Sequence, residues 1–155
     1  MTPAILTARR AGIRFDVLEY GHDPAATSYG LEAAEKLQLP PEQVFKTLVI
    51  QLDGSELLVA LVPVQHQLDL KALARQAGGK KAQMADAALV ERTTGYVLGG
   101  VSPLGQKKPL RTLIDSSASD FAQIYVSAGR RGLELQLAPA DLAACCRAIF
   151  VPLAR

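Results

Sequence analysis

The sequence predicts an α+β protein: a single compact domain over residues 1–155, built as a mixed α+β fold or a small mixed barrel flanked by helices. Its 155 residues, 49% of them hydrophobic, can bury one core and leave little room for a second. Helical and strand-like patterns alternate along the chain. Two β-rich runs joined by Asp53-Gly54 indicate a hairpin, which favours antiparallel pairing over a doubly wound parallel sheet.

The N-terminal segment predicts one helix and one strand. Thr2 is placed to cap a helix that has Pro3 at its first position and ends at Gly12. Hydrophobic and polar residues then alternate over 13–18, which is the period of a half-buried strand. This alternation places Val17 on the buried face.

The central part predicts three helices around the hairpin. A helix over 28–37 ends before a pair of prolines, because the residue before a proline disfavours helical geometry. The hairpin occupies 45–64. A further helix begins after Asp69 and ends at Gly78-Gly79, and the run 84–95 predicts another.

The C-terminal third predicts short strands and a last helix. Its β-rich runs are separated by turn residues, and a proline opens the helix. Strands are expected near 110–115, 123–127 and 133–137, with a turn at 129–132, a helix from Pro139 and a closing strand within 149–153.

Charge and hydropathy narrow the class of protein. No run approaches the roughly 20 apolar residues of a membrane span, and the N-terminus lacks the pattern of a secretory signal, so a cytoplasmic protein is expected. The net charge of +2 does not identify a polyanionic partner by itself. Basic residues cluster, however, and would bind a nucleic-acid backbone if the clusters converged, or form solvated surface if they were scattered. The basic clusters are Lys80-Lys81, Lys107-Lys108 with Arg111, and Arg130-Arg131.

Few side chains suit metal or thiol chemistry. Cys145 and Cys146 are neighbours in a helix-like segment, where a mutual disulfide would be strained, and they are predicted to act as small hydrophobic residues near the core. Neither His22 nor His66 lies at ligand spacing from another histidine or from a cysteine. We therefore expect no metal and no cofactor.

The glycine-rich segment GYVLGGVSPLGQKK, residues 95–108, invites comparison with phosphate-binding loops. Gly100 and Gly105 have the spacing of a P-loop, but Gln106 stands where that motif requires lysine. Ser102 misses the spacing of the hydrolase nucleophile elbow. The glycines either bring backbone N–H groups close to a ligand or only permit a sharp bend.

Seven ordered blocks distributed over the chain resemble the YbaK family, the free-standing relatives of the editing domain inserted in bacterial prolyl-tRNA synthetases. The resemblance implies the YbaK/prolyl-tRNA synthetase editing-domain fold, a compact mixed domain with a curved, largely antiparallel sheet, which agrees with the pattern of elements above. The blocks are MTPA at 1–4, YGHDPA at 20–25, VFKTLV at 44–49, QLDLKALA at 67–74, KKAQMAD at 80–86, TGYVLGGVSPLGQKK at 94–108 and IYVSAGRRGLEL at 124–135.

The resemblance implies a catalytic set. Lys46 in VFKTLV matches the family's essential lysine and would bind the phosphate or ribose of the tRNA end, and Thr47 follows it as in the family. Gly99 and Gly100 match the family's GG-x-x-P loop, which resembles a site for the aminoacyl carbonyl. Without the resemblance, a lysine that opens a strand indicates a surface charge.

The resemblance also implies substrate-binding residues. Tyr20 matches a pocket tyrosine that would support the terminal adenosine; its structural alternative is an aromatic residue at the end of a strand. Ser127 in YVSAG also matches the family, and its alternative is an ordinary turn serine. Glu134 in RGLEL departs from the aspartate of close relatives, and its alternative is an exposed residue paired with a nearby arginine. Lys107 and Lys108 are expected to contact the tRNA backbone.

The implied function is that of a trans-editing aminoacyl-tRNA deacylase that removes cysteine from mischarged Cys-tRNA(Pro) and from Cys-tRNA. The sequence shows no Ser-His-Asp or Cys-His set, so the cysteine thiol of the substrate would attack its own ester carbonyl and leave as a thiolactone. Prolyl-tRNA synthetase is the suggested partner. Two alternatives stay open: a water-using editor of Ala-tRNA or Ser-tRNA, and a module that binds a tRNA or oligonucleotide end without cleaving it.

Overall fold

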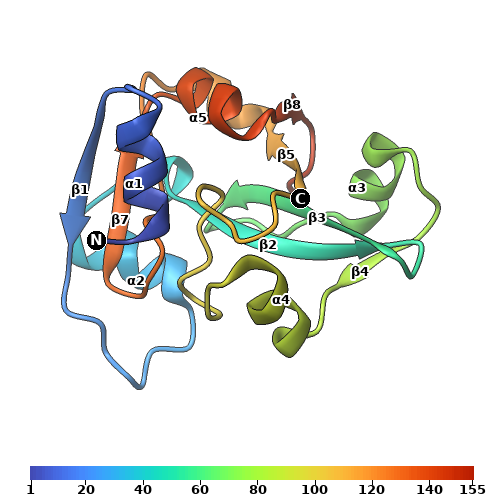
Figure 1. The fold of residues 1–155 in the computed structure, drawn as a ribbon, viewed down its shortest axis with the longest axis horizontal. Helices are drawn as coiled ribbons and strands as arrows, with labels where there is room; N and C mark the ends of the chain where they lie inside the picture. Colours follow the sequence, from blue (N-terminus) through green and yellow to red (C-terminus); the bar gives the residue numbers. More distant parts are fainter.

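The computed structural model describes residues 1–155 without a gap and confirms the predicted α+β class (Figure 1). The α-helices are α1 (Pro3–Arg10), α2 (Tyr29–Lys36), α3 (Leu70–Ala77), α4 (Ala87–Thr94) and α5 (Pro139–Cys146). The strands are β1 (Phe15–Glu19), β2 (Phe45–Leu52), β3 (Glu56–Pro63), β4 (Ala82–Met84), β5 (Arg111–Asp115), β6 (Ile124–Ser127), β7 (Leu133–Leu137) and β8 (Ile149–Val151). Two 3₁₀ turns lie at Pro41–Gln43 and Ser116–Asp120.

The strands form two open sheets rather than a barrel. One sheet has the order β4-β2-β3-β5-β8 and the other the order β1-β7-β6. Only the β3–β5 and β5–β8 pairs are parallel, so the sheets are largely antiparallel, as predicted. An isolated bridge between Val44 and Tyr125 joins the first residues of the β2 segment to the second sheet.

The predicted hairpin is formed by β2 and β3. Asp53 and Gly54 at its tip have φ angles of 52° and 72°, the left-handed region that glycine and aspartate tolerate best. The Asp53 carboxylate also accepts the backbone N–H groups of Lys80 and Lys81, at 2.9 and 2.8 Å. These bonds hold the turn before β4 against the hairpin tip.

Capping groups set the helix ends. The Thr2 hydroxyl accepts the Ile5 N–H at 3.2 Å, and Gly78 ends α3 in the left-handed conformation, both as predicted. The helix predicted over 84–95 starts later, at Ala87. Ala82–Met84 pairs with β2 as the short strand β4, whose three residues are too few for a period-2 pattern to be recognised.

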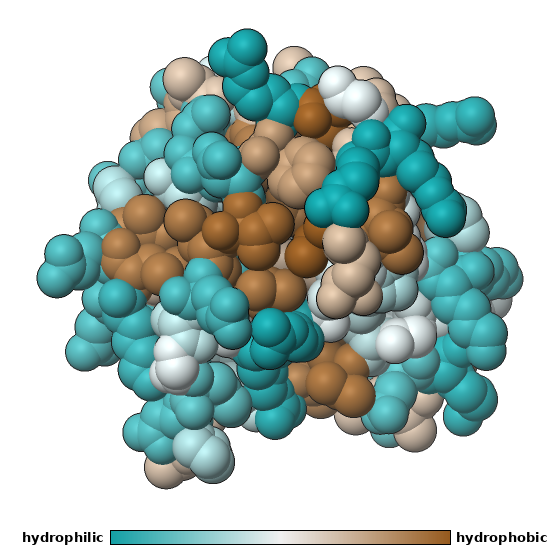
Figure 2. All heavy atoms as spheres, turned by 60° about the vertical axis from the view of Figure 1, so that its left-hand side comes forward, coloured by the Kyte–Doolittle hydropathy of each residue, from teal (hydrophilic) through white to brown (hydrophobic).

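Strand β1 corrects one expectation about burial. Val17 lies opposite Leu135 of β7, but its predicted burial is wrong: it is 41% exposed, whereas Leu18 is half-buried. The physical reason is that β1 is an edge strand with no neighbour beyond it. Figure 2 shows this side of the molecule, where hydrophobic side chains form a band among hydrophilic ones.

Two hydrophobic clusters stabilise the arrangement. The larger contains side chains of α1, α5, β2, β6 and β7, with Leu135 and Leu142 fully buried. The smaller lies between the β2–β3 hairpin and α3 and includes Ile50 and Leu73. None of the helices is long and apolar enough to cross a membrane.

Candidate functional site

A cavity of about 300 Å³ gathers residues from distant parts of the chain. Its walls come from the end of β1, the start of α2, the start of β2, the loop after α4, the end of β6 and the start of β7. Six of the nine predicted site residues line it: Tyr20, Lys46, Thr47, Gly99, Ser127 and Glu134. The other lining residues are Thr27, Ser28, Tyr29, Gly30, Phe45, Leu48, Leu98 and Val101.

Glu134 is the buried acid of this cavity. It is the second residue of β7, opposite Ser127 of β6 and Leu18 of β1, and is only 7% exposed. Burial raises the pKa of its carboxyl to about 8, so the group is mainly protonated at neutral pH. The alternative of an exposed residue paired with arginine is wrong, since Arg130 contacts Glu19 and the arginine next to it stacks on a tyrosine.

Lys46 and Thr47 enter the cavity from the start of β2. Lys46 is half-buried, burial lowers the pKa of its ammonium, and no carboxylate lies within ion-pair distance. The Thr47 hydroxyl oxygen is buried and has no hydrogen-bond partner. An unsatisfied buried polar group costs roughly 1–3 kcal/mol, so this hydroxyl is a candidate contact for a ligand.

Tyr20 and Ser127 border the cavity on the sheet formed by β1, β7 and β6. Burial, together with the nearby Glu134 carboxylate, raises the pKa of the Tyr20 hydroxyl. The Ser127 hydroxyl accepts the Gly129 N–H at 3.2 Å, so it has the turn role foreseen as its alternative. It also lines the cavity, where its hydrogen remains free to donate.

The two glycines of the GG-x-x-P loop have different roles. Gly99 lines the cavity with φ at +85°, and its N–H makes no hydrogen bond within the protein. A Cβ there would lie 2.6 Å from Tyr29, so only glycine fits. Gly100 is turned away: its N–H donates to the Val97 carbonyl at 2.9 Å, and the Arg130 backbone fills the space beside it. The Gly100 N–H is therefore not free to bind an ester carbonyl.

The loop that carries these glycines is closed at its base. The N–H groups of Lys107 and Lys108 donate to the carbonyls of Thr94 and Thr93, at 2.8 and 3.1 Å. Both lysines lie outside the cavity and line a separate groove. The chain then continues into β5 instead of a helix, which agrees with the rejection of a P-loop.

The rim of the cavity contains residues that sequence reasoning missed. The Arg131 guanidinium lies 4.4 Å from the centre of the Tyr29 ring and donates to the Leu98 carbonyl at 2.9 Å. Leu98 itself is 48% exposed. In the sequence, Arg131 belonged to a turn and a basic pair and Tyr29 to a helix start, so no local pattern could join them.

The Glu32 carboxylate, which sequence reasoning also missed, fixes the segment between β1 and α2. The buried Glu32 carboxylate accepts bonds from the His22 ring at 2.7 Å, the Asp23 N–H at 2.8 Å and the Lys36 ammonium at 3.0 Å. Burial opposes ionisation of Glu32, but these three bonds outweigh it and lower its pKa to about 2. The network holds His22 against Tyr29, with the ring centres 5.8 Å apart.

The cavity has no thiol among its lining residues and no cluster of metal ligands. Cys145 and Cys146 line a different cavity, next to α1 and the end of the glycine-rich loop. They pack against the main core as predicted, and burial raises the pKa of Cys146 to about 11. No group of three or more His, Cys, Asp or Glu side chains is arranged to hold a metal ion.

A family model of the aminoacyl-tRNA editing domain matches residues 22–145, most of the chain and all but one of the residues that line the cavity. The chain belongs to this family. The resemblance seen in the sequence blocks is thus confirmed.

Two of the relatives are named for the deacylation of aminoacyl-tRNA. The chain is 42% identical over 106 residues to EbsC of Enterococcus faecalis, named as a candidate Cys-tRNA(Pro)/Cys-tRNA(Cys) deacylase, with 68% of this chain and 65% of EbsC covered. It is 30% identical over 100 residues to the multifunctional Ser/Thr-tRNA deacylase ProXp-y of Escherichia coli K12, covering 62% of this chain and 60% of that protein. Both relatives bear the name of the predicted enzyme class, and each is matched over less than two thirds of its length.

A solved structure confirms the editing-domain fold. The crystal structure of a candidate trans-editing enzyme for prolyl tRNA synthetase superposes with a TM-score of 0.85 at 25% identity, covering 100% of this chain and 99% of that one. The chain therefore has the fold of this candidate trans-editing enzyme.

Proposed function

We propose that this protein is a trans-editing aminoacyl-tRNA deacylase that removes cysteine from mischarged Cys-tRNA(Pro) and from Cys-tRNA. One observation carries the proposal. A cavity sized for a small ligand combines an ammonium (Lys46), an unsatisfied hydroxyl (Thr47) and a buried acid (Glu134), with no cysteine or histidine among its lining residues. The relationship to EbsC supports the choice of cysteine.

The proposed binding mode follows from the charges. The Lys46 ammonium has no carboxylate partner in the protein, so it is available for the terminal phosphate or ribose of the tRNA. Gly99 offers an unpaired backbone N–H to the ester carbonyl, and Tyr20 supports the terminal adenosine. The neutral carboxyl of Glu134 and the hydroxyl of Ser127 provide polar contacts for the aminoacyl group.

The proposed reaction uses the substrate's own thiol. Its sulfur attacks the ester carbonyl, a C–S bond forms, and the ester C–O bond breaks. The ribose oxygen leaves with the thiol proton, which gives free tRNA and a cysteine thiolactone. The protein's part is to orient the ester and to stabilise the developing oxyanion through the Gly99 N–H and the Lys46 charge; orientation of this kind is worth up to about 7–11 kcal/mol.

A second candidate is a water-using editor. The relationship to ProXp-y favours it, because that relative is named for Ser-tRNA and Thr-tRNA, whose hydroxyls are poor nucleophiles. In this case water replaces the thiol, and the Glu134 carboxyl, once ionised, is the nearest candidate for a general base. The third candidate, a module that binds a tRNA end without cleaving it, is tested by the same experiment.

Prolyl-tRNA synthetase is the proposed partner. The solved structure that superposes on this chain is named for an enzyme that edits for that synthetase. A partner would supply tRNA selection, which the small cavity does not provide. Editing of charged tRNA would take place in the cytoplasm, where translation occurs.

The test measures release of labelled amino acid from Cys-tRNA, Ala-tRNA and Ser-tRNA. We expect release of cysteine alone, and loss of release in Lys46→Ala. Replacement of both Cys145 and Cys146 by serine is the matched control and should retain activity, since neither thiol lines the cavity. Release of alanine or serine would instead support the water-using editor, and binding of tRNA without release would support the binding module.

A further inference from the structure

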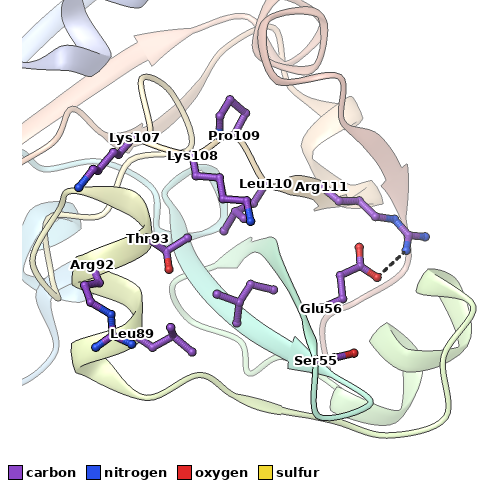
Figure 3. A pocket seen from close by; sticks show the side chains of 11 residues that line it. Ser55, Glu56, Leu89, Arg92, Thr93, Lys107, Lys108, Pro109, Leu110 and Arg111 are labelled. Atoms are coloured by element: carbon purple, nitrogen blue, oxygen red, sulfur yellow. Dashed lines mark ion pairs between the residues drawn. The ribbon is translucent and has the colours of Figure 1, made fainter.

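A second hollow, larger than the cavity and separate from it, lies between α4, the β2–β3 hairpin and the start of β5. Its volume is about 750 Å³, and it shares no lining residue with the cavity. We call it the basic groove. It is lined by Ser55, Glu56, Leu57, Leu89, Arg92, Thr93, Lys107, Lys108, Pro109, Leu110 and Arg111 (Figure 3).

The groove has a strong excess of positive charge. Arg92, Lys107 and Lys108 form no ion pair with any acidic side chain, and all three are exposed. The fourth cation, Arg111, lies 3.6 Å from Glu56, the only acid of the groove (Figure 3). Three unpaired cations therefore border one hollow in a protein whose net charge is only +2.

The position of these cations is fixed by the backbone. Lys107 and Lys108 donate their N–H groups to the last carbonyls of α4, so both lysines are held next to the helix turn that carries Arg92. Figure 3 shows Lys108 pointing into the open space between α4 and the hairpin. The anchored backbone keeps the three cations on one side of the hollow, where they can face a row of anions.

One loop connects the basic groove to the cavity. Residues 95–108 leave the end of α4, place Leu98 and Gly99 on the cavity wall, and return to place Lys107 in the groove. Gly95 and Lys107 close the loop at its base, where a Cβ on Gly95 would lie 3.5 Å from the lysine side chain. The two hollows therefore lie at opposite ends of one anchored loop.

We propose that the basic groove binds the phosphate backbone of the RNA whose aminoacylated end enters the cavity. The proposal rests on the proposed function for the identity of that RNA. Phosphate oxygens are the anions that occur in continuous rows, and Lys and Arg side chains are their usual contacts. The wall residues are mostly polar, which favours a wet, charged interface over a lipid surface.

The proposal also assigns a role to the Arg111–Glu56 ion pair. Glu56 repels phosphate and neutralises the fourth cation, so it limits affinity and allows release of the RNA. Its removal should free Arg111 for a further phosphate contact. This predicts that a loss of negative charge in the groove strengthens binding, which a merely structural role for the pair would not do.

The experiment measures binding of a labelled, uncharged acceptor-stem RNA hairpin by fluorescence anisotropy at several salt concentrations. For Arg92→Gln/Lys107→Gln/Lys108→Gln, we expect affinity to fall about tenfold or more near 100 mM salt, and the salt slope of log K to fall by about 3. Glu56→Gln should raise affinity about twofold to fivefold. The matched control removes the same charge elsewhere, as Arg9→Gln/Arg10→Gln/Arg14→Gln, and should change affinity little.

The outcomes distinguish a failure of the groove proposal from a failure of the proposed function. Equal losses in the groove variant and the control would overturn the proposal, because net charge alone would then explain binding. Unchanged RNA affinity in the groove variant would also overturn the proposal. This includes the case in which the variant loses binding only to anionic vesicles or to an acidic peptide. Absence of deacylation by the wild-type protein, combined with a groove-dependent salt slope, would refute the proposed function and leave the groove as an RNA site.

Discussion

Glu134 allows a quantitative test of the cavity through the pH dependence of stability. Burial raises the pKa of this carboxyl from its ordinary 4.5 to about 8. Below about pH 4.5 the group is protonated in both the folded and the unfolded protein. Between the two values the unfolded chain releases the proton and the folded protein keeps it, so the free energy of unfolding falls as the pH rises, until Glu134 ionises near pH 8.

The expected size of the effect is large. Each pH unit between the two pKa values removes about 1.4 kcal/mol from the free energy of unfolding. From pH 5 to pH 8 the loss is about 4 kcal/mol, against the roughly 5–15 kcal/mol that holds a typical domain together. Glu134→Gln keeps the shape of the neutral carboxyl and cannot ionise, so its free energy of unfolding should lack this slope.

Urea unfolding at pH 5, 6, 7 and 8 measures the slope directly. We expect the wild-type protein to lose stability over this range relative to Glu134→Gln, so that the variant is the more stable protein at pH 8. Glu35→Gln, at an exposed position of α2, is the control and should follow the wild type. Parallel pH profiles for the wild type and Glu134→Gln would refute the reasoning and show that the carboxyl is hydrated in the folded protein.

Three further predictions concern single contacts. Thr47→Val removes an unsatisfied buried hydroxyl, so it should leave stability unchanged or raise it by about 1 kcal/mol while it slows deacylation; retained turnover would show that the hydroxyl does not touch the substrate. Glu32→Gln should cost about 1–3 kcal/mol in urea unfolding at pH 7, and the difference should shrink as the pH falls toward 2, through the lowered pKa of the native carboxyl; a constant difference would contradict this. Gly105→Ala should lower thermal stability by more than about 2 kcal/mol, because φ is +68° and the new Cβ would lie 2.5 Å from the backbone carbonyl group of Pro3; an unchanged Tm would show that the loop shifts freely.

The sequence by itself determined most of the elements, though not the short strand β4, and it determined the family. Capping residues such as Thr2 and Asp69, the Asp53-Gly54 hairpin and the helix-ending glycines act over a few residues, so their effect is readable locally. The family blocks determined which side chains to look for, among them Lys46 and Glu134. The structure confirmed the largely antiparallel sheets but gave two open sheets in place of a barrel.

Only the tertiary structure decided which of those side chains meet, and in what state. Burial of Glu134, the unsatisfied hydroxyl of Thr47 and the stacking of Arg131 on Tyr29 depend on residues far apart in the sequence. The separation of the basic groove from the cavity likewise depends on residues far apart in the sequence. Solvation and pairing of a polar group are set by every segment that packs around it, and a local pattern records only one of those segments.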